Sequence, residues 1–101
     1  MLFALVFIVL LAGVQASTGL SCAQCTTYAN QVKAFCGGNL KTLTQACMKN
    51  YLMTTCKKNG NSVATCTNAY NQLLPFFTKT VTQSRAGKSI SFMCHGIYQC
   101  T

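Results

Sequence analysis

Eight cysteines constrain the fold of this 101-residue chain more than any other feature. They run from Cys22 to Cys100, behind an apolar N-terminal stretch. An even set at this density is typical of a small secreted domain held by disulfides, because thiols stay reduced in the cytosol. The count alone leaves about a hundred pairings open.

The N-terminal stretch predicts a signal peptide. Residues 2–12 are almost all large and apolar, and this run is shorter than the roughly 20 residues that cross a bilayer. Val14 and Ala16 then stand at the −3 and −1 positions of a cleavage site. We therefore expect a signal peptide over 1–16 and one mature domain over 17–101, which is secreted to the outside or stored in a secretory granule.

The charge balance argues against an enzyme. The chain has eight Lys and Arg, no Asp or Glu, and a net charge of +8. Carboxylate-pair hydrolysis, a Ser-His-Asp triad and a carboxylate calcium site all lack their acidic members. Cys22 and Cys25 have zinc or redox spacing, but His95 is the only histidine and no βαβ context surrounds the pair. We expect no catalytic residue, no metal and no cofactor.

Apolar residues recur at intervals of three and four, which predicts an all-α fold of four or five helices. The stripes cover 22–36, 40–56, 63–81 and 90–97, with Ser62 and Ser89 as candidate N-caps. Pro75 is expected to kink the third helix or split it in two. The polar segment 78–88 is expected to form a loop.

The order and spacing of six cysteines resembles the saposin-like family, which includes saposins, NK-lysin, granulysin and amoebapores. The resemblance rests on Cys22-x2-Cys25, Cys56-x9-Cys66 and Cys94-x5-Cys100, and it covers the mature chain. It implies a saposin-like bundle of amphipathic helices with both chain ends stapled together. Cys36 and Cys47 are extra to the six-cysteine pattern and are left to pair with each other. The implied disulfides are Cys22–Cys100, Cys25–Cys94, Cys36–Cys47 and Cys56–Cys66.

The positive charge favours an anionic phospholipid membrane as partner. Each Lys or Arg near such a surface contributes about 1 kcal/mol, so about four together would strengthen binding close to a thousandfold. The alternative is that these side chains only keep the protein soluble. The candidate anion-binding residues are Lys57, Lys58, Lys79, Arg85 and Lys88.

An apolar run at 73–77 is the candidate for membrane insertion. Five consecutive apolar residues cannot all face inward from one helix, so we expect Leu74, Phe76 and Phe77 to insert. Core packing around the Pro75 bend is an equally open alternative. Phe92, Met93 and Tyr98 could add a second apolar edge.

These features predict a cationic saposin-like protein that permeabilises anionic membranes, as an antimicrobial or cytolytic agent. It could form a homodimer or oligomer on the membrane. A second hypothesis is a toxin or ligand that acts on an ion channel or receptor through a polar surface. A third is a lipid-binding or transfer protein. We expect no nucleic-acid partner, because the chain carries no recognised reading motif.

Overall fold

The computed structural model describes Leu20–Thr101, so the predicted signal peptide over 1–16 lies outside the described residues. This part of the chain contains four α-helices, one 3-10 helix and no strand. The predicted all-α fold is therefore confirmed, and it is consistent with a saposin-like bundle. The helices are α2 (Cys22–Phe35), η1 (Leu40–Thr42), α3 (Gln45–Lys58), α4 (Val63–Arg85) and α5 (Ile90–Gly96).

Hydroxyl side chains cap the N-termini of all four α-helices between Leu20 and Thr101, in a chain that has no carboxylate side chain for this purpose. Ser21, Thr44, Ser62 and Ser89 each accept a hydrogen bond from a backbone N–H in the first turn. Replacing such a cap with alanine typically costs about 1 kcal/mol. The Gly37 and Gly38 turn that follows α2 has positive φ values of 101° and 82°, which glycine adopts at little cost.

Helix α4 runs unbroken for 23 residues through Pro75. This excludes the split that was one of the two expectations for Pro75. The expectation of a loop over 78–88 is wrong for 78–85, which is helical. The hydroxyls of Thr78, Thr80 and Thr82 each donate to the carbonyl four residues earlier. Thr80 and Ser84 are also buried, so tertiary packing outweighs the weak helix propensity of this segment.

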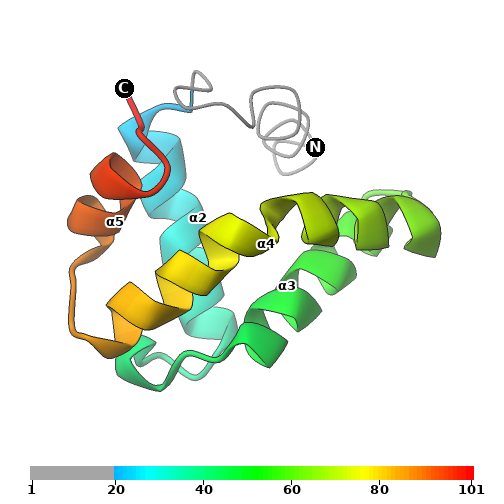
Figure 1. Cartoon of the computed structure of the whole chain (residues 1–101). Coiled ribbons are helices and arrows are strands. Elements are labelled where there is room, and N and C mark those ends of the chain that lie inside the picture. Colours follow the sequence, from blue (N-terminus) through cyan, green and yellow to red (C-terminus); the bar gives the residue numbers. More distant parts are fainter. Residues whose placement is uncertain (1–19) are drawn as a thin grey trace.

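The helices pack as two pairs, α2 against α5 and α3 against α4 (Figure 1). Two disulfides hold the first pair together, and we call them the clasp. Cys25–Cys94 joins α2 to α5, and Cys22–Cys100 joins the start of α2 to the segment after α5. Two backbone hydrogen bonds reinforce the clasp. The Cys22 N–H donates to the Thr101 carbonyl, and the Thr101 N–H donates to the Leu20 carbonyl. The first and last parts of the described chain are thus held side by side.

The other two disulfides bridge consecutive helices. Cys36–Cys47 links the end of α2 to the start of α3, and Cys56–Cys66 links the end of α3 to the start of α4. All eight cysteines are bonded, and the four pairs coincide with those implied by the resemblance.

Candidate membrane-binding surface and apolar cavity

An apolar cavity of about 100 Å³ lies between the two helix pairs. Each α-helix of the described residues contributes to its wall, with Val32 from α2, Leu52 from α3, Leu73 from α4 and Ile90 from α5. Apolar walls such as these favour small apolar ligands over water. The partly open space between the helix pairs therefore suits hydrocarbon better than water.

One polar pair lies on the cavity wall. The Thr80 hydroxyl donates to the Phe76 carbonyl (2.8 Å), so the Tyr98 hydroxyl is the donor in its 2.7 Å bond to Thr80 Oγ1. Burial raises the pKa of Tyr98 to about 12, because a phenolate loses solvation there.

This burial predicts a specific loss of stability in alkali. The unfolded chain loses the Tyr98 proton near the ordinary pKa of 10.0, whereas the folded chain keeps it until about 12. The contribution of Tyr98 to the free energy of unfolding is therefore fully present below pH 10. It falls as the pH rises, by about 1 kcal/mol at pH 11. Urea unfolding at pH 8 and pH 11 should show a steeper loss for the wild type than for Tyr98→Phe. Equal losses would contradict the assignment.

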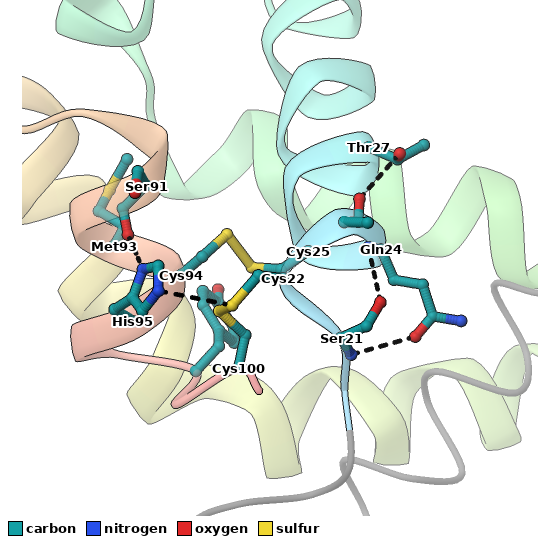
Figure 2. Close-up of a disulfide and its surroundings, with 12 residues drawn as sticks. Ser21, Cys22, Gln24, Cys25, Thr27, Ser91, Met93, Cys94, His95 and Cys100 are labelled. Carbon is teal, nitrogen blue, oxygen red and sulfur yellow. Dashed lines mark hydrogen bonds between the residues drawn. A yellow bond between two sulfur atoms is a disulfide. The ribbon is translucent and has the colours of Figure 1, made fainter.

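His95 lies beside the Cys22–Cys100 disulfide and is exposed (Figure 2). Its Nδ1 carries a hydrogen, because it faces the Ser91 carbonyl at 2.8 Å and a carbonyl can only accept. Its Nε2 lies 3.6 Å from Cys22 Sγ. His95, Cys22 and Cys100 lie close enough together to suggest a metal site. Because the two cysteines are bonded to each other, the cluster offers no thiolate to a metal ion.

The cationic side chains differ in what they contact. Lys57, Lys58 and Lys79 are exposed. Arg85 instead donates from Nη1 to the Leu43 carbonyl (3.2 Å), which ties α4 to the segment after η1. Lys88 Nζ lies 5.0 Å from the centroid of the Phe92 ring, a cation–π contact that pairs a charge with an exposed aromatic.

The candidate inserting residues differ in their exposure to solvent. Phe77 is only 8 % exposed and belongs to the core, so the expectation that it is available at the surface is wrong for this structure. Phe76 is half-buried and stacks on Tyr98 at 5.9 Å between ring centroids. Leu74 remains 37 % exposed. The alternative of core packing around Pro75 thus holds for the two phenylalanines.

Other apolar side chains do reach the surface. Phe92 is 50 % exposed, whereas its neighbour Met93 is buried. Phe35 and Val63 are also exposed, and the sequence analysis missed them. The position of Phe35 off the apolar stripe of its helix was the signal that could have found it.

Within the described residues, no helix combines the length and the apolar character needed to cross a membrane. Comparison with protein-family models, curated proteins and solved structures finds no match for this chain.

Proposed function

We propose that this chain is a secreted member of the saposin-like family that binds and permeabilises anionic membranes. The observation that carries the proposal is an uncompensated charge of +8 on a small helical body with exposed apolar side chains. Four disulfides, typical of extracellular proteins, support an outside location.

Charge and apolar exposure would act together at the membrane. Each lysine near an anionic surface contributes about 1 kcal/mol, and this attraction fades as salt screens it. Apolar side chains must then hold the protein after adsorption. Lys88 and Phe92 lie in contact and offer both properties at one place, and Leu74 is a further exposed candidate.

Dye leakage from vesicles tests this function. We expect the wild type to release dye from phosphatidylglycerol-containing vesicles at protein concentrations at least about tenfold below those needed for phosphatidylcholine vesicles. Phe92→Ala should lower the leakage while leaving unfolding by urea nearly unchanged, because the ring is half exposed. Equal leakage from both vesicle types, or leakage from neither, would overturn the proposal.

The apolar cavity favours a second candidate function, the binding or transfer of a lipid. A hydrocarbon chain would replace empty space beside Val32, Leu52 and Leu73. A lipid retained in stoichiometric amount during native mass spectrometry, without vesicle leakage, would favour this candidate over the first.

A further inference from the structure

Three lysines from distant parts of the sequence line one surface depression of about 220 Å³. Lys33 comes from the last turn of α2, Lys41 from η1, and Lys88 from the loop between α4 and α5. These segments gather at one end of the bundle (Figure 1). None of the lysines has a carboxylate side chain as partner, since the sequence contains none.

The backbone around the depression brings these segments close together. Gly38 and Gly87 line it without side chains. A Cβ atom placed on Gly87 would lie 3.7 Å from Lys41 Cε, so the Lys41 side chain reaches across from η1 to the loop that carries Lys88. Tertiary structure thus brings three lysine residues to the wall of one depression.

Asn39 adds a neutral donor. Its Oδ1 accepts from the Lys41 backbone N–H at 2.9 Å, which fixes the side chain at the start of η1. Its amide nitrogen makes no hydrogen bond to the described part of the chain and remains available to a ligand at the wall of the depression.

We propose that Lys33, Lys41, Lys88 and Asn39 form a binding site for a phosphate group. Ammonium groups bind phosphate as point charges, and clustering them raises the local concentration of anions. In the proposed function, this site would bind the phosphate of a lipid headgroup. That use of the site rests on the proposed function. Lys88 would then contact the phosphate while the adjacent Phe92 ring meets the apolar part of the membrane.

Two triple variants with the same charge test the site. Lys33→Gln, Lys41→Gln and Lys88→Gln remove the pocket charges, whereas Lys57→Gln, Lys58→Gln and Lys79→Gln remove exposed charges outside the pocket. Both triples change the net charge from +8 by −3, to +5. Calorimetric titration with inorganic phosphate at constant ionic strength gives the affinity, and circular dichroism checks that each variant is folded.

We expect the pocket triple to bind phosphate about 100-fold more weakly, at about fivefold per lysine, and the control triple to change by no more than about threefold. Wild-type protein that does not bind phosphate, or equal weakening in both triples, would overturn the site.

Vesicles containing phosphatidylglycerol then distinguish a headgroup from free phosphate. Selective loss of vesicle binding in the pocket triple supports a headgroup. Selective loss of phosphate binding alone supports a soluble phosphate ester. Leakage that both triples reduce equally overturns the headgroup role while the proposed function stands. If the wild type binds phosphate at the pocket but causes no leakage, the proposed function is wrong and the phosphate site is supported.

Discussion

Replacing Cys22, Cys25, Cys94 and Cys100 together with alanine is expected to leave the protein unfolded at 37 °C. The two bridges span 78 and 69 residues and close nearly the same loop. Closing that loop once stabilises the fold by about 4 kcal/mol, and the second bridge then closes only a small ring, worth about 2–3 kcal/mol. The sum of about 7 kcal/mol is comparable with the whole stability of a small domain.

Single-bridge variants serve as controls for this prediction. Cys22→Ala with Cys100→Ala should lose only about 2–3 kcal/mol and stay folded, because Cys25–Cys94 still holds the chain ends. Cys36→Ala with Cys47→Ala should cost about 3 kcal/mol, since that bridge spans 11 residues. Circular dichroism during urea and thermal unfolding measures these effects. A four-alanine variant as stable as the single-bridge variants would contradict the account of the clasp.

Leu73→Ala is expected to destabilise the fold by about 3–4 kcal/mol. Leu73 is 1 % exposed and lines the apolar cavity, so truncation enlarges a space that the surrounding helices already leave unfilled. Urea unfolding monitored by circular dichroism gives the free energy, and the steepness of the transition shows whether unfolding stays cooperative.

The adjacent residue supplies a matched control. Leu74 has the same side chain in the same helix but is 37 % exposed, so Leu74→Ala should cost less than about 1 kcal/mol. From the sequence, Leu74 is expected to reach the surface, and this pair of variants tests the difference in burial between the two leucines by experiment. Similar losses for both variants would show that the burial of α4 is misassigned.

The sequence predicted the helical class, the caps at Ser62 and Ser89 and, through resemblance to a family, the cysteine pairs. It missed the last eight residues of α4, 78–85, because threonine and serine have weak helix propensity and the burial of Thr80 depends on packing with Tyr98. Local patterns cannot report a contact between residues 18 positions apart.

The candidate site was less accessible to sequence reasoning. Neighbouring charges such as Lys57 and Lys58 are easy to see, whereas Lys33, Lys41 and Lys88 become neighbours only after folding. Arg85 and Lys88 read as one basic group in the sequence, yet Arg85 donates to the Leu43 carbonyl while Lys88 contacts Phe92. Which apolar side chains remain exposed was likewise decided by packing, as the burial of Phe77 shows.

Both the fold and the function proposed for it depend on the joining of the chain ends, and tryptic mapping of the unreduced protein tests this most directly. Trypsin cuts after the lysines that separate the paired cysteines. The account predicts that the peptide ending at Lys33 is released covalently attached to 89–101, with 34–41 attached to 42–49 and 50–57 attached to 59–79. Release of 89–101 as a separate peptide, with Cys94 bonded to Cys100, would contradict it.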